Sequence, residues 1–138
     1  MSARPLADTR VVDLDFAKVM GGRDRRDLVC VYELRANGRR LSSGVVGFVP
    51  IKHLKLSDPG LTAKVRPAGD QWAVTVKAKS LARFVRLSLA ERDVVWSDNW
   101  FDLPAGESRT VTCPRRSGHT AAKVKAGLRL AHLYASYA

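Results

Sequence analysis

The chain has 138 residues, of which 46% are hydrophobic and 27% are charged, as expected of one folded domain or two small ones. A (β/α)₈ barrel typically needs about 250 residues, so this chain by itself is too short to form one. The 24 lysines and arginines outnumber the 13 aspartates and glutamates, and the formal net charge of +11 raises the question of an acidic partner.

Apolar side chains recur at every second position in most of the chain, which is typical of strands and not of helices. They alternate with aspartates over residues 12–16, and a second apolar run covers residues 28–34. Asn37-Gly38 comes next, and this dipeptide readily adopts the two positive φ angles of a type I′ turn. It predicts a hairpin with residues 41–49, and so three antiparallel strands in the first part of the chain.

These three strands would share an apolar face, and a large uncovered apolar face is unusual in a soluble protein. We therefore expect the second part of the chain, or another chain, to cover that face. The segment Ser57-Asp58-Pro59-Gly60 is polar and rich in turn formers, so it is the candidate boundary between the two parts.

Further alternating runs follow this boundary, and turn-forming sequences separate them. Strands at this spacing indicate an all-β antiparallel sandwich or barrel. A last run at residues 124–130 is predicted to be a closing strand, because Gly127 would weaken a helix there. The earlier runs are residues 61–66, 72–78, 81–89 and 109–113. The expected core residues are Trp72, Val74, Val76, Val85, Leu87 and Val111.

Membrane insertion and secretion find no support in the sequence. The longest apolar stretch, residues 45–51, is far shorter than the roughly 18 residues of a membrane-spanning helix, so no membrane partner is expected. The N-terminus lacks the apolar centre of a signal peptide, so the chain as written is expected in the cytoplasm. Cys30 and Cys113 lack the spacing of a zinc site and are expected to be buried thiols, with a single bridge as the alternative.

Catalytic and metal-binding chemistry is hardly visible. None of the three histidines stands three or four residues from a second potential ligand, so neither a metal ion nor a cofactor is expected. The sequence contains no nucleophile elbow and no glycine motif that would cradle a phosphate. The histidines are His53, His119 and His132.

Carboxylates offer no convincing catalytic pair either. The glutamates are few, and two of them fall in predicted turns. Asp98 and Asp102 form the one cluster to consider, but side chains four residues apart face each other only on a helix, which this segment does not resemble. The sequence therefore predicts no catalytic residue. The glutamates are Glu33, Glu91 and Glu107.

The most distinctive segment lies just before the predicted turn at Pro104-Ala105-Gly106, and its short polar side chains can bond to the backbone and fix a tight bend. The main interpretation is a structural corner that delivers one aromatic ring to the core and one to a neighbour. The alternative is a sugar-stacking platform built from Trp96 or Trp100. The segment comprises Ser97, Asp98, Asn99, Trp100, Phe101 and Asp102.

Several stretches resemble the C-terminal end of β-mannosidases of glycoside hydrolase family 2, a family that also includes exo-β-glucosaminidases. The resemblance covers residues 10–137, with Pro104-Ala105-Gly106 as a small departure from the usual Leu-Pro-Gly. It implies that residues 57–138 form an immunoglobulin-like β-sandwich. The stretches are FVPIKHLKLSDPG (48–60), SLARFVRLSL (80–89), VVWSDNWFDLPAGESRTVTC (94–113) and LRLAHLYASY (128–137).

The resemblance also implies an organisation and a role. Residues 1–56 would be the closing strands of a preceding immunoglobulin-like module, and the whole chain would be a non-catalytic accessory region that braces a catalytic barrel. In this family the paired glutamates of the retaining mechanism belong to the barrel, and no glutamate here matches their motifs. The expected partners are the barrel and preceding domains of the parent glycosidase, with a homo-oligomer as a further expectation.

Two other functions remain open at this point. The tryptophans suit a carbohydrate-binding module, and the net charge of +11 suits a domain that binds nucleic acid or another polyanion. The basic residues are spread over the whole chain, and the aromatic residues fall in predicted strands and not in an RNA-binding pattern. No specific nucleic-acid partner is therefore expected.

Overall fold

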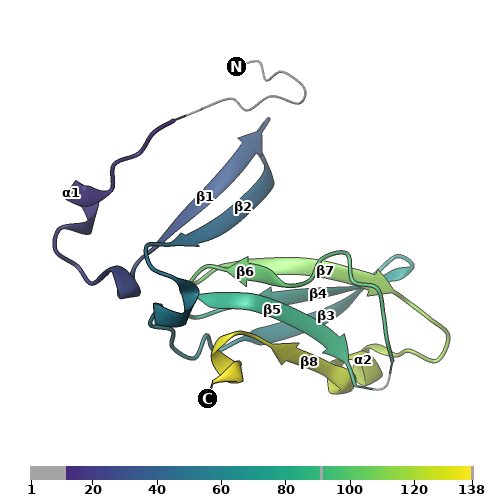
Figure 1. Cartoon of the computed structure of the whole chain (residues 1–138). Coiled ribbons are helices and arrows are strands. Elements are labelled where there is room, and N and C mark those ends of the chain that lie inside the picture. Colours follow the sequence, from purple (N-terminus) through teal and green to yellow (C-terminus); the bar gives the residue numbers. More distant parts are fainter. Residues whose placement is uncertain (1–11, 91, 138) are drawn as a thin grey trace.

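The computed structural model describes residues 12–90 and 92–137, and Figure 1 shows their arrangement. None of the helices within these ranges has the length and apolar character that a membrane crossing requires. The first part contains α1 (Ala17–Met20), the 3₁₀ turn η1 (Arg25–Asp27), β1 (Val29–Ala36), β2 (Arg39–Gly47) and the 3₁₀ turn η2 (Ile51–His53). The second part contains β3 (Thr62–Ala68), β4 (Gln71–Lys77), β5 (Ala82–Leu89), β6 (Phe101–Leu103), β7 (Ser108–Pro114), α2 (Ala121–Gly127), β8 (Leu128–Ala131) and the 3₁₀ turn η3 (Tyr134–Ser136).

The second part of the chain folds into a sandwich of two antiparallel sheets. One sheet has the strand order β3-β4-β7 and the other has the order β6-β5-β8. Pro67 lies in β3, an edge strand, where a residue without an N–H is tolerated. The prediction of an all-β antiparallel sandwich is confirmed.

The core of the sandwich lies between the two sheets. All six residues that the alternation predicted as core are buried, so this prediction is confirmed. Five of them pack together with buried residues of β6 and with Ala78 and Ala82. Trp72 belongs to a second cluster at one end, where it packs with Cys113 and Val124. This second cluster fixes α2 onto the end of the sandwich.

The predicted closing strand at residues 124–130 is only partly correct, because its first half is the helix α2 and only the second half is β8. The Thr120 side chain accepts a hydrogen bond from the Lys123 N–H and so caps the helix. Gly127 is the last residue of α2, so it does not interrupt the helix. Burial of the Val124 side chain outweighs the alternating pattern.

The first part of the chain contains two strands in its described residues, and the predicted strand at residues 12–16 is absent. The Asp15 carboxylate instead accepts a hydrogen bond of 2.9 Å from the Ala17 N–H, at the start of α1. The ring of Phe16 contacts that of Phe48 edge-on, with centroids 5.4 Å apart. A local polar contact and one aromatic pair therefore hold this segment without a strand ladder.

The predicted hairpin is confirmed. β1 and β2 pair antiparallel around a turn at Asn37 and Gly38, whose φ angles of 50° and 74° are those of the expected type I′ turn. Near its middle, the Tyr32 ring lies across Gly44 of the facing strand, and a Cβ at Gly44 would collide with that ring. Glycine at this position is therefore required by the close approach of the aromatic ring.

The hairpin keeps much of its apolar surface exposed. Val45 is the one side chain of β1 or β2 that is buried, and Figure 1 shows the hairpin projecting away from the sandwich. The expectation that the second part of the chain covers this face is therefore wrong, whereas cover by another chain stays a prediction. The exposed large apolar residues of the hairpin, which we call the hairpin patch, are Val31, Tyr32, Leu34, Leu41 and Val46.

Polar contacts fix the base of the hairpin. The Lys55 ammonium group lies 2.9 Å from the Asp24 carboxylate and 3.1 Å from that of Asp27. Hydrogen bonds from Arg26 and then from Lys55 hold the pKa of the Asp24 carboxyl well below its usual range. The Lys55 N–H also donates to the Arg26 carbonyl at 2.9 Å. These contacts join the segment before β1 to the segment after η2.

The turn-forming segment at residues 57–60 leads directly into the sandwich. Pro59 is fully buried, and its carbonyl accepts hydrogen bonds from the N–H groups of Lys79 and Ser80. The Asp58 carboxylate accepts a hydrogen bond of 2.9 Å from the Gly60 N–H and closes a tight turn. This segment is therefore packed against the sandwich and is not a free linker.

Candidate functional site

The segment at residues 97–102 crosses from one sheet of the sandwich to the other. At its start, Ser97 forms two hydrogen bonds with Thr112 of β7. The Ser97 N–H donates to the Thr112 carbonyl at 2.8 Å, and the Thr112 N–H donates to the Ser97 hydroxyl oxygen at 2.9 Å. Residue 97 is therefore attached to the β3-β4-β7 sheet.

The next polar side chains attach the segment to β5 in the opposite sheet. The Asn99 carboxamide accepts a hydrogen bond from the Leu87 N–H at 2.7 Å and donates one to the Leu87 carbonyl at 3.0 Å. The Asp102 carboxylate accepts hydrogen bonds from the Arg83 side chain at 2.9 Å and the Phe84 N–H at 3.1 Å. The two side chains thus supplement the short β6 ladder with hydrogen bonds to the β5 backbone.

Asp98 stabilises the bend between these two attachments. Its carboxylate accepts a hydrogen bond of 2.8 Å from the Asn99 N–H and lies 2.6 Å from the Arg109 guanidinium group of β7. The same guanidinium group lies 4.9 Å from the centroid of the Phe101 ring. Asp98 therefore connects the corner to β7 and holds a cation over the buried ring.

The three aromatic residues of this region have different environments. Phe101 is buried in the core, whereas Trp100 is 62% exposed. Trp96 is half-buried and packs against both core clusters. Among the described residues, no ring contact joins Trp96 to Trp100. Trp96 is therefore part of the core, and Trp100 alone offers a face to a ligand or a neighbour.

Trp100 has an unusual backbone conformation in common with a second exposed aromatic residue, Phe84. Phe84 and Trp100 have φ angles of 53° and 63°, in the left-handed region that costs a residue with a side chain roughly 1–2 kcal/mol. Arg83 lies 5.4 Å from the Phe84 ring centroid, and Arg86 lies 5.7 Å from that of Trp100. Each exposed ring, with its own flanking arginine, is a candidate contact point of the sandwich.

Comparisons with known families agree with this architecture. Residues 56–136 match the mannosidase family described as an Ig-fold domain, and residues 1–53 match the family described as a mannosidase Ig/CBM-like domain. The chain belongs to the Ig-fold domains of mannosidases. No curated protein gives a significant match.

An Ig-like region of a mannosidase is an accessory region, and its glutamates agree with that role. Hydrogen bonds from Arg35 and then Arg40 hold the pKa of Glu33 below its usual value. Arg40 also contacts the Glu107 carboxylate at 3.0 Å, so one guanidinium group joins β2 to the turn before β7. Glu91, which was expected in a turn, lies outside the described residues.

The two aspartates of the segment at residues 97–102 also form ion pairs. Asp98 pairs with Arg109 and Asp102 pairs with Arg83, each within 2.9 Å. Each carboxylate also accepts a backbone hydrogen bond. These bonds give both groups structural roles in the corner.

The remaining candidate ligands and nucleophiles of this Ig-like region are its histidines and cysteines. In the part of the chain that the structure describes, no three histidine, cysteine or acidic side chains gather as a metal site would require. Both cysteines are free thiols, with Cys113 buried and Cys30 only half-buried. Burial raises the pKa of the Cys113 thiol, which keeps it protonated and unreactive near neutral pH.

Sequence reasoning missed several residues that the structure brings together. Arg83 and Arg109 are distant in sequence from the carboxylates they pair with, so no local pattern signals them. The left-handed backbone at Phe84 carries no signal either, because glycine or asparagine is usual there. A cavity beside α2 was missed because that segment was expected to be a strand.

The corner yields a test of stability. Asn99→Ala should lower the free energy of unfolding by about 2–3 kcal/mol, because two hydrogen bonds are lost and the Leu87 backbone groups are left unpaired. Asp98→Ala should cost about 1 kcal/mol or less, because it removes a half-exposed ion pair and one local hydrogen bond. Urea denaturation followed by tryptophan fluorescence measures both, and equal losses for the two variants would contradict this assignment.

Proposed function

We propose that the chain is a non-catalytic accessory region of a β-mannosidase-like enzyme of glycoside hydrolase family 2, and that it braces a catalytic barrel elsewhere in the parent protein. In this proposal residues 1–56 are the closing strands of a preceding immunoglobulin-like module, and residues 57–138 are the final sandwich. The proposed partners are the barrel and the preceding domains. The two matches to mannosidase Ig-like families support this assignment.

The observation that carries the bracing role is the hairpin patch. Its side chains are large and apolar, and four of them are more than half exposed: Tyr32, Leu34, Leu41 and Val46, at 54%, 59%, 58% and 53%. Tyr32 and Leu34 lie two residues apart in β1 and so share one face of the hairpin, and exposed apolar surface on one face marks a site of interaction with another protein. The sandwich has a closed core of its own, so the patch is available to a partner.

The hairpin patch can be tested with an apolar dye. The isolated chain should bind anilinonaphthalene sulfonate at the patch, and Leu34→Ser should reduce the fluorescence of the bound dye because it removes a central apolar side chain. Val95→Ser is the matched control, because Val95 is 80% exposed but lies outside the hairpin. Dye binding that is absent, or that falls equally in both variants, would contradict the proposal. Sedimentation of the same samples shows whether a homo-oligomer covers the patch instead.

The absence of catalysis is a second expected outcome. The isolated chain should release no aryl alcohol from an aryl β-mannoside or β-glucosaminide above a heat-treated control. Retaining hydrolysis needs two carboxyl groups about 5–5.5 Å apart, one of them protonated. Turnover that disappears in Asp98→Ala or Asp102→Ala, while the circular dichroism spectrum is unchanged, would show that the corner is an active site.

Carbohydrate binding is a second candidate function, and the exposure of Trp100 favours it. An exposed indole face can stack on a sugar ring, and Arg86 beside it can donate hydrogen bonds to hydroxyl groups. If this function holds, β-1,4-mannotriose should change the tryptophan fluorescence in a saturable way, and Trp100→Ala should abolish the change. An unchanged emission spectrum up to millimolar sugar would exclude this function and leave Trp100 as a contact with a neighbouring domain.

A further inference from the structure

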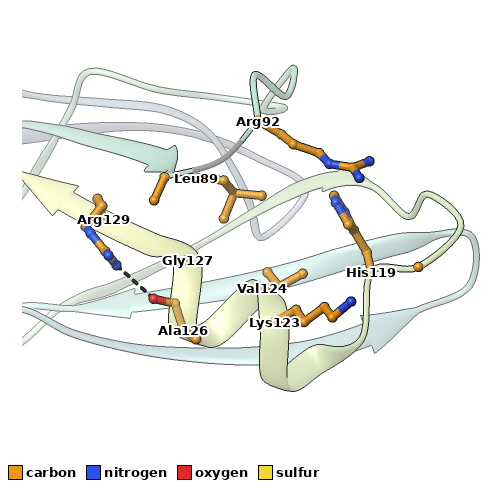
Figure 2. A pocket seen from close by; sticks show the side chains of 10 residues that line it. Leu89, Arg92, His119, Lys123, Val124, Ala126, Gly127 and Arg129 are labelled. Atoms are coloured by element: carbon orange, nitrogen blue, oxygen red, sulfur yellow. Dashed lines mark hydrogen bonds between the residues drawn. The ribbon is translucent and has the colours of Figure 1, made fainter.

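A cavity lies beside α2 at one end of the sandwich, where the end of β5, the start of β8 and the loop before α2 meet (Figure 2). Its volume is about 320 Å³, which is in the size range of small-molecule sites. Leu89 and Val124 contribute apolar side chains to its wall. The cavity is remote from the proposed bracing surface, because none of its lining residues belongs to the hairpin.

Basic side chains dominate the polar lining of this cavity. Arg92, His119, Lys123 and Arg129 all contribute to it, and no acidic side chain of the described residues does. Arg129 is already engaged, because its guanidinium group donates to two backbone carbonyls at 2.8 and 3.1 Å. Figure 2 shows Arg92, His119 and Lys123 on the other side of the cavity, with Arg92 directed toward His119.

This concentration of positive charge differs from the arrangement elsewhere in the protein. At the hairpin and the corner, arginines such as Arg40, Arg83 and Arg109 are paired with carboxylates. Within the described ranges, neither Arg92 nor Lys123 forms an ion pair. Cations that line one cavity without a counter-charge repel each other, and an anion between them would remove that repulsion.

His119 adds a second observation that points to a ligand. Its Nδ1 atom is buried and has no hydrogen-bond partner among the described residues. A buried polar atom without a partner is unfavourable, so a ligand that pairs with this ring is favoured. The backbone on this side is already fixed, because the His119 N–H donates to the Arg116 carbonyl at 3.1 Å. An oxyanion in the cavity accepts a hydrogen bond from a His119 ring nitrogen that carries a proton.

We propose that this cavity binds a small anionic ligand, with its phosphate or carboxylate group between Arg92, His119 and Lys123 and its less polar part against Leu89 and Val124. Arginine and lysine bind such groups through charge-assisted hydrogen bonds, which are stronger than those between neutral partners. The site is independent of the bracing role and of the proposed sugar contact at Trp100, so either can fail without affecting the other.

Nuclear magnetic resonance titration tests the site. Inorganic phosphate, a hexose 6-phosphate and a hexuronate are added separately at constant ionic strength, with the unmodified hexose as the uncharged reference. We expect saturable shifts in the amide signals of Gly118, His119 and Lys123 with at least one of the anions and none with the hexose. The anion that binds most tightly identifies the source of the charged group.

Paired variants separate a defined site from general attraction to a basic protein. Lys123→Gln should weaken binding by about tenfold or more, because it removes a charged donor from the cavity. Lys125→Gln removes the same charge from the same helix outside the cavity and should leave the affinity unchanged. Equal weakening in both variants, shifts spread over the whole surface, or no saturation would overturn the proposal. Unchanged signals from β4 and β7 confirm that each variant is folded.

Discussion

The two hydrogen bonds between the Asn99 carboxamide and the backbone of Leu87 are the interaction on which the sandwich depends. β6 has only three residues, and its pairing with β5 shifts register between Ala82 and Val85, so the strand ladder alone leaves part of β5 without a partner on this side. The Asn99 side chain pairs with that part of β5. Because Ser97 is bonded to β7 just before it, the same short segment fixes one sheet against the other.

The high net charge has a structural explanation in part. Several arginines are committed to carboxylates or lie over aromatic rings, so they act as packing and pairing groups in an accessory region with few acidic residues. Arg115, for example, lies 4.7 Å from the centroid of the Trp72 ring and covers one end of the core. Where an arginine is paired with a carboxylate, the local charge is neutralised. The net positive charge of the surface therefore concentrates at the cations that have no such partner.

Alternation and turn chemistry were sufficient to predict the sandwich, its core and the hairpin turn, because these depend on burial and on backbone angles that local sequence controls. The strand predicted at residues 12–16 is absent, because these residues pair with no other strand. The strand predicted over α2 is a helix, because the cap at Thr120 and the burial of Val124 outweigh the alternating pattern. The corner was recognised as a corner, but its bonds to Leu87 depend on the relative position of two strands. A pattern within one short segment does not encode how two strands are placed relative to each other.

The contacts between the hairpin and the sandwich imply two levels of local stability. Arg40 and Glu107 join the strand β2 to the sandwich through an exposed ion pair, and such pairs contribute little and are screened by salt. β4 and β5, in contrast, are held by a closed apolar core. The backbone amides of β1 and β2 can therefore exchange with solvent through local opening, whereas those of β4 and β5 exchange when the whole sandwich unfolds. In the isolated chain the hairpin is thus the part that is free to reorganise when a partner arrives.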